Sequence, residues 1–166
     1  MYGPGRVPKD SLRVEAYGTV DELNSYIGIV VSGCKFSTIR SPLKRIQTLL
    51  LVAGADLATD SRRETARVPR ITAKDVKLLE QMTDQLLRKL PPLTRFILPG
   101  GSALSAQIHF ARAVCRRAER RVVALARAED INGELTPYFN RLSTYLFDLA
   151  RYANSLEKRK EETWQA

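Results

Sequence analysis

Five arginines between residues 112 and 121 are the side chains best suited to chemistry. Arg112, Arg116 and Arg120 recur every four residues, so on a helix they share one face, while Arg117 and Arg121 form a neighbouring stripe. A row of guanidiniums on a rigid helix suits a polyphosphate, because each planar fork binds two oxygens and stays protonated. The alternative is a solvated basic face, and the charges alone favour that alternative.

A long helix is predicted to position these arginines. Gly100 and Gly101 release the backbone for a turn, and Ser102 is a good N-cap. No proline or glycine follows until Gly133, after the polar turn that begins at Glu129. The apolar face of this helix consists of Ile108, Ala111, Cys115, Ala118, Val122 and Leu125.

Four further helices are predicted from apolar residues at helical spacing. The first begins after Asp10 and ends near Ser32, and residues 33–41 are predicted to connect it to a second helix with Pro42 in its first turn. The third begins at the cap residue Thr72, which pairs with Asp75, and continues to about Leu90. Its inward side chains are Val76, Leu79, Met82, Leu86, Leu87 and Leu90.

The last helix opens near Pro137, and several of its polar residues are predicted to lie away from its apolar stripe: Asn140, Arg141, Thr144, Asp148 and Arg151. Residues 58–71 are predicted to form a loop whose basic side chains are solvated: Arg62, Arg63, Arg67 and Arg70. No segment alternates long enough to require a strand. The sequence therefore predicts an all-α bundle of five helices.

Length and composition limit the class of protein. A chain of 166 residues suggests one domain spanning residues 1–166, and its net charge of +9 favours anionic partners. No apolar stretch reaches about 18 residues, so no membrane association is expected. The N-terminus has no apolar signal core, so we expect a cytoplasmic location. Cys34 and Cys115 match no metal spacing, so buried reduced thiols are expected. No zinc-finger spacing, RRM-like signature or Arg/Gly-rich segment points to nucleic acid.

Three blocks together resemble the PduO-type ATP:cob(I)alamin adenosyltransferases. They read RVEAYGTVDELNSYIG at 13–28, FILPGGS followed by HFARAVCRRAERR between 96 and 121, and NRLSTYLFDLARYAN at 140–154. The blocks occur in the order that this family has. The resemblance implies a ferritin-like five-helix bundle that assembles as a homotrimer with active sites between subunits. It also implies transfer of the 5′-deoxyadenosyl group of ATP to cob(I)alamin, with Mg²⁺ bound through the ATP phosphates rather than by a dedicated metal site.

The resemblance assigns roles residue by residue. The ATP-site positions are Lys9, Arg116, Arg117, Glu119, Arg120 and Asn140. Arg112 corresponds to an arginine that pairs across the subunit interface with the aspartate matching Asp21, and Phe96 to an aromatic that packs under the corrin ring. These last three residues, with Arg116, are the expected catalytic set, and Phe96 and Arg112 the corrinoid contacts. A lone helical histidine, His109, is expected to be structural.

Two departures from the family pattern qualify these assignments. The family usually begins with a TRxGDxGxT-like segment that wraps the ATP phosphates, and this sequence begins after it. The segment is therefore expected to lie outside the sequence or beyond a misassigned start, or else ATP binding is weak. Thr144 stands where an aspartate is expected, which questions the usual polar role of that position.

Three functions stay open at this point. The first is the adenosyltransferase, with a reductase and an adenosylcobalamin-dependent mutase as possible partners. The second is a corrinoid carrier without efficient catalysis, which a missing N-terminal segment would favour. The third is a basic helical module that binds nucleic acid, which net charge alone suggests. Phe96 likewise has an alternative interpretation as an ordinary core aromatic.

Overall fold

The five predicted helices are all present in the structure, a computed structural model that describes residues 8–59 and 68–164. They are α1 (Leu12–Gly33), α2 (Ser37–Leu57), α3 (Ala73–Leu87), α4 (Ala103–Ala128) and α5 (Leu135–Leu156). Within the described ranges the only β pairing is one isolated antiparallel bridge between Ile97 and Thr163. The all-α prediction is therefore confirmed.

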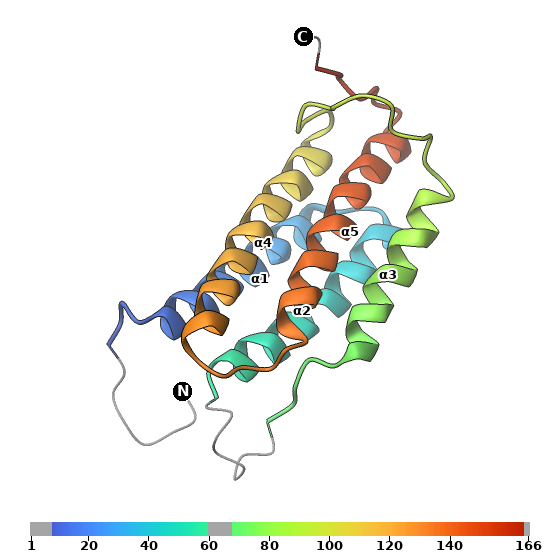
Figure 1. Cartoon of the computed structure of the whole chain (residues 1–166). Coiled ribbons are helices and arrows are strands. Elements are labelled where there is room, and N and C mark those ends of the chain that lie inside the picture. Colours follow the sequence, from blue (N-terminus) through green and yellow to red (C-terminus); the bar gives the residue numbers. More distant parts are fainter. Residues whose placement is uncertain (1–7, 60–67, 165–166) are drawn as a thin grey trace.

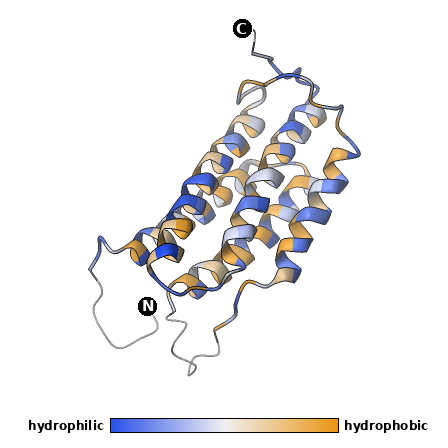
Figure 2. Ribbon diagram, viewed as in Figure 1, coloured by the Kyte–Doolittle hydropathy of each residue, from blue (hydrophilic) through white to orange (hydrophobic). Residues whose placement is uncertain are grey.

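The helices lie side by side along one common direction (Figure 1). α1 packs on α2 and α4, α5 packs on α4 and α3, and a smaller contact between α2 and α5 closes the bundle. Each helix carries hydrophobic residues along one side and hydrophilic residues along another (Figure 2). The predicted apolar face of α4 is buried throughout, and both cysteines are buried free thiols, as expected.

α5 is buried on more sides than its apolar stripe indicates. Asp148 and Arg151 were predicted to lie away from the stripe, yet they are 5% and 3% exposed. Both residues do lie off the stripe, but they are buried because helices pack on several sides of α5 and because Pro91 and Glu161 contact Arg151. Three polar residues in the first half of α5 are partly or fully exposed: Asn140, Arg141 and Thr144.

Two helix boundaries differ from the predictions. α2 begins at Ser37, so the predicted connection 33–41 is too long and Pro42 lies inside the helix rather than in its first turn. A proline there removes the hydrogen bond to the carbonyl of Thr38, an exposed residue whose carbonyl water can solvate. α3 ends at Leu87, three residues early, and Leu87 is exposed rather than inward.

The end of the bundle opposite Phe96 is held by a buried carboxylate. Asp56 on α2 accepts hydrogen bonds from Arg70 (2.7 Å), from the Ile71 amide (3.1 Å) and from the Asn132 side chain (2.6 Å). Arg70 was predicted to be solvated, and its ion pair with Asp56 corrects that prediction. Arg62, Arg63 and Arg67 lie outside the described residues. This network connects the chain before α3 to the turn between α4 and α5. It thereby stabilises the position of α4 relative to its neighbouring helices.

Candidate active site on the arginine face of helix α4

Arg116 lies between two adjacent hollows on the outer face of α4 and α5. One hollow, of about 220 Å³, is lined by Arg112, Arg116, Ser143, Thr144 and Phe147. The other, of about 360 Å³, is lined by Arg116, Glu119, Arg120, Val123, Ala124 and Arg127. Arg112, Arg116 and Arg120 therefore share one face of α4, as predicted. Their guanidiniums line one continuous cationic surface.

Glu119 connects the arginine face of α4 to α5. Its carboxylate lies 3.6 Å from the Arg116 guanidinium and accepts a hydrogen bond of 2.9 Å from the Asn140 side chain on α5. Asn140 in turn accepts from Arg141, which pairs with Glu80 on α3. The Glu119 side chain is mostly buried, whereas that of Arg116 is half exposed. The structure thus joins three predicted ATP-site residues and leaves the Arg116 guanidinium open to a ligand.

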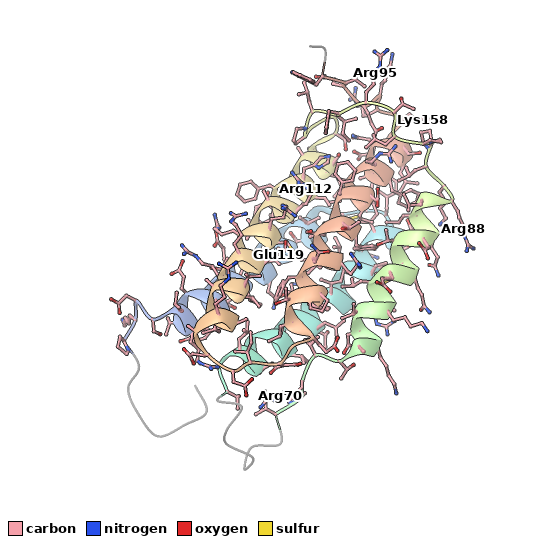
Figure 3. All side chains as sticks on the ribbon, viewed as in Figure 1. Arg70, Arg88, Arg95, Arg112, Glu119 and Lys158 are labelled. Carbon is pink, nitrogen blue, oxygen red and sulfur yellow. The ribbon has the colours of Figure 1, made fainter. Side chains whose placement is uncertain are left out.

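Arg112 is less exposed than Arg116 and Arg120, the other two arginines of the row. Its Nε is buried, and no hydrogen-bond partner for it occurs among residues 8–59 and 68–164. Burial, followed by repulsion from Arg116, lowers the pKa of Arg112 from its ordinary value. A buried donor without a partner is costly, so this guanidinium is suited to an acceptor from outside the described residues. Asp21 on α1 is exposed and makes no ion pair with Arg112 within the described chain. In Figure 3, Arg112 and Glu119 lie on the side of α4 that faces α5.

The structure does not bring every predicted ATP-site residue to the hollows. Arg117 pairs with Glu22, and Arg121 pairs with Glu15 at 3.1 Å, so both reach towards α1. Lys9 lies just before α1, at the end of the bundle where α4 finishes, since Arg13 of α1 pairs with Glu129 at 2.7 Å. Lys9 and Arg117 therefore lie outside the surface on which Arg116 and Arg120 meet.

Phe96 is not core packing. Its side chain is 79% exposed, in the segment that joins α3 to α4, so the alternative interpretation as a core aromatic is wrong. The backbone around it pairs with the C-terminal tail, since the Trp164 amide donates to the Phe96 carbonyl at 2.9 Å. The chain therefore presents an aromatic ring at the end of the bundle where α4 begins.

Two residues that line the Arg112 hollow were missed from the sequence, Ser143 and Phe147 of α5. Their spacing from Asn140 and Thr144 is the signal that could have found them, because these four positions fall along one helix face. Thr144 donates to the Asn140 carbonyl at 3.3 Å. An uncharged hydroxyl therefore stands in this hollow, where the family pattern leads one to expect a carboxylate.

His109 is a buried residue of α4. Its ring lies edge-on to Phe147 with centroids 5.9 Å apart. Burial, with a smaller contribution from the Arg112 charge, lowers the pKa of His109 to about 4, against an opposing effect of Glu161. The imidazole is neutral at physiological pH and does not add to the positive charge of the site.

No group of three or more His, Cys, Asp or Glu side chains suited to a metal occurs within residues 8–59 and 68–164. Glu119 is the only carboxylate among the residues that line the two hollows, and Arg116 and Asn140 already engage it.

Within residues 8–59 and 68–164, no helix has the length and apolarity needed to cross a membrane.

Comparisons with known proteins bear on this site. The sequence model for cobalamin adenosyltransferase matches residues 1–153. A corrinoid adenosyltransferase from Citrobacter freundii is 41% identical over 151 residues, which cover 91% of this chain and 86% of that protein. One from Bacillus subtilis is 44% identical over 155 residues, covering 91% and 79%.

Solved structures agree. A variant of the PduO-type ATP:corrinoid adenosyltransferase from Lactobacillus reuteri, complexed with cobalamin and ATP, superposes with a TM-score of 0.92 at 38% identity. The match covers 96% of this chain and 90% of that one. With the family model spanning most of the sequence and the bundle reproduced closely, the chain belongs to the cobalamin adenosyltransferase family.

Proposed function

We propose that the protein transfers the 5′-deoxyadenosyl group of ATP to cob(I)alamin, giving adenosylcobalamin and triphosphate. The observation that carries the proposal is the Arg116–Glu119–Asn140 arrangement beside two hollows, in a chain of this family. In the reaction, the Co(I) electron pair forms a bond to C5′ of the ribose. The C5′–O bond breaks, and its electron pair leaves with the triphosphate.

The leaving group determines what the protein must supply. Triphosphate carries about four negative charges, so fixed cations beside it stabilise the charge that develops in the transition state. Arg116 and Arg120 are the proposed phosphate contacts, and Glu119 with Asn140 would hold Arg116 in position. No side-chain nucleophile is needed, because the nucleophile is the cobalt itself.

Mg²⁺ would enter with the nucleotide. Magnesium is commonly bound by substrate phosphates and water with one or two carboxylates, and here Glu119 is the carboxylate that lines the hollow. Because Glu119 is already engaged, the phosphate oxygens would supply most of the ligands. Lys9 and Arg117 stay proposed ATP contacts that require a different arrangement or a neighbouring subunit.

A homotrimer is the proposed assembly, with the site between subunits. The Nε of Arg112, which has no partner among residues 8–59 and 68–164, and the exposed carboxylate of Asp21 support it, because each offers what the other could bind. A cytoplasmic setting, a reductase that supplies cob(I)alamin and a mutase that receives the product are further parts of this proposal.

The direct test is to mix the purified protein with ATP, Mg²⁺ and chemically reduced cob(I)alamin and to follow the corrinoid absorption spectrum. Formation of adenosylcobalamin at a rate that depends on protein concentration is expected. Binding of the corrinoid without conversion would contradict the proposal and favour the carrier.

Phe96→Ala tests the corrinoid side of the site. An aromatic ring below the corrin excludes an axial donor, and a four-coordinate Co(II) is easier to reduce because no axial donor raises the energy of the accepting orbital. We expect the variant to slow the reaction that starts from cob(II)alamin with an added one-electron reductant, and to affect the reaction from cob(I)alamin less. Electron paramagnetic resonance of bound cob(II)alamin with ATP should show an axial ligand in the variant.

Leu93→Ala is the matched control, an exposed apolar residue of the same segment. An unchanged four-coordinate signal and an unchanged rate in Phe96→Ala would remove Phe96 from the site.

A further inference from the structure

The segment that carries Phe96, residues 91–102, is tied at both ends to one turn of α5. At the first end, Arg151 donates a hydrogen bond of 2.9 Å to the Pro91 carbonyl. At the second, the Asn154 side chain donates to the Gly100 carbonyl (3.1 Å) and accepts from the Ser102 amide (2.9 Å). Because Arg151 and Asn154 are three residues apart, they share one face of the helix.

The middle of the segment is tied to the C-terminal tail, residues 157–164. The Leu98 amide donates to the Glu162 carbonyl at 2.8 Å, and the Trp164 amide donates to the Phe96 carbonyl at 2.9 Å. These two bonds flank the bridge between Ile97 and Thr163. The alternation of side chains along paired strands then directs Phe96 and Leu98 to the side opposite Ile97, in agreement with their exposure. Figure 1 shows the tail crossing the end of the bundle beside this segment.

A buried ion pair anchors the tail. Glu161 accepts from Arg151 through one oxygen at 2.9 Å and through the other at 3.4 Å. The Arg151 side chain is 3% exposed, and it also lies 3.9 Å from the carboxylate of Asp148. The Arg151 guanidinium therefore binds both partners of the backbone pairing at Phe96. It contacts the tail through Glu161, and it contacts the segment that carries Phe96 through the Pro91 carbonyl. A bidentate pair of this kind fixes orientation as well as distance.

We propose that Glu161 is a positioning residue: its ion pair with Arg151 fixes the C-terminal tail, and the tail fixes the backbone from which Phe96 reaches the corrinoid. The effect on the reaction rests on the proposed function, whereas the effect on the segment does not. Phe96 is 79% exposed, so packing of its own ring contributes little to its position within the chain. The backbone pairing with the tail supplies that constraint.

The first experiment measures amide hydrogen exchange in Glu161→Ala, with Glu162→Ala as the matched control. Glu162 is the neighbouring residue of the same type, is exposed, and uses only its carbonyl in the pairing. Loss of a charge-assisted contact should speed exchange at Leu98 and Trp164 by about tenfold or more in Glu161→Ala only. Amides within α4 should be unchanged. Trp164, the single tryptophan, gives a second readout through its fluorescence anisotropy.

The second experiment follows bound cob(II)alamin with ATP. Glu161→Ala should gain an axial-ligand signal and lose roughly tenfold to a hundredfold in rate from cob(II)alamin with an added one-electron reductant, since small misplacements are costly at a reacting centre. The KM for ATP should be unchanged, and Glu161→Gln, which keeps a neutral hydrogen bond, should be intermediate. A wild-type protein that forms no adenosylcobalamin contradicts the proposed function. Equal exchange in Glu161→Ala and Glu162→Ala overturns the role of Glu161 whatever the activity.

Discussion

Arg116 is the residue on which the phosphate side of the proposal depends. It borders both hollows and is braced by Glu119 at 3.6 Å. Arg116→Ala should cost about 2–4 kcal/mol of transition-state stabilisation, as the loss of an oriented donor does elsewhere. We expect kcat/KM for ATP to fall accordingly while the Kd for the corrinoid changes little.

Arg121→Ala is the control for this prediction, since Arg121 lies on the same helix but pairs with Glu15 of α1. Steady-state kinetics with varied ATP and a separate corrinoid titration measure the two effects. Normal ATP kinetics in Arg116→Ala would remove that residue from the phosphate site.

His109 makes the stability of the protein depend on pH. Its pKa of about 4 in the folded state lies below the ordinary 6.5, so the unfolded chain binds a proton first as the pH falls. Stability should therefore decrease between pH 6.5 and 4, by up to about 3 kcal/mol from this group. His109→Gln should remove that part of the decrease, as urea unfolding at several pH values would show.

The chain has one histidine, so the imidazole resonance is unambiguous in an NMR titration. A midpoint near 4 is expected for the native protein. A midpoint near 6.5 would contradict the burial of this ring.

The turn that starts α4 depends on a glycine and an asparagine that come from different elements. Gly101 has a φ of +99°, and a Cβ there would lie 2.4 Å from Asn154 Oδ1, the atom that accepts from the Ser102 amide. Gly101→Ala therefore strains the backbone and displaces the side chain that holds both Gly100 and Ser102. We expect a loss of about 1–3 kcal/mol in the free energy of unfolding.

Gly100→Ala is a stringent control, because nothing lies within 4 Å of a Cβ built at that residue. Urea unfolding monitored by circular dichroism compares the two variants. Equal midpoints would show that the turn tolerates a side chain at Gly101.

At the scale of the assembled molecule, Asp21 and Arg112 should act as a pair between subunits. The buried Nε of Arg112 has no partner in the described chain, and Asp21 is exposed. If the pair is buried in the proposed trimer, removing either partner leaves the other charge uncompensated, at a cost of roughly 3–5 kcal/mol. A double-mutant cycle read by trimer stability and by activity should show strong coupling.

Glu22 provides the matched comparison, since it neighbours Asp21 but pairs with Arg117 of its own chain. A cycle between Glu22 and Arg112 should be additive. Additive effects of Asp21→Ala and Arg112→Ala would show that the two residues do not meet.

The sequence by itself determined the five helices, the shared face of the arginines and the turn before α4. These follow from local rules, namely apolar residues at helical spacing, cap residues and glycines, which depend on neighbours within a few positions. The capping box of Thr72 and Asp75 and the Ser102 cap are both present in the structure, as predicted. The residues of the three family blocks likewise predict a candidate site on α4 and α5.

Only the tertiary structure decided which polar residues are buried and what they bind. Asp56, Asp148 and Arg151 look like surface residues in sequence, because a helical stripe shows one buried face and not whether neighbours cover a second. The sequence left open whether Phe96 is a corrinoid contact or a core aromatic, and the structure rules out the core because Phe96 is exposed on a backbone that pairs with the C-terminal tail. The partners of Arg117, Arg70 and Arg151 were hidden for the same reason: each comes from a segment that only packing brings close.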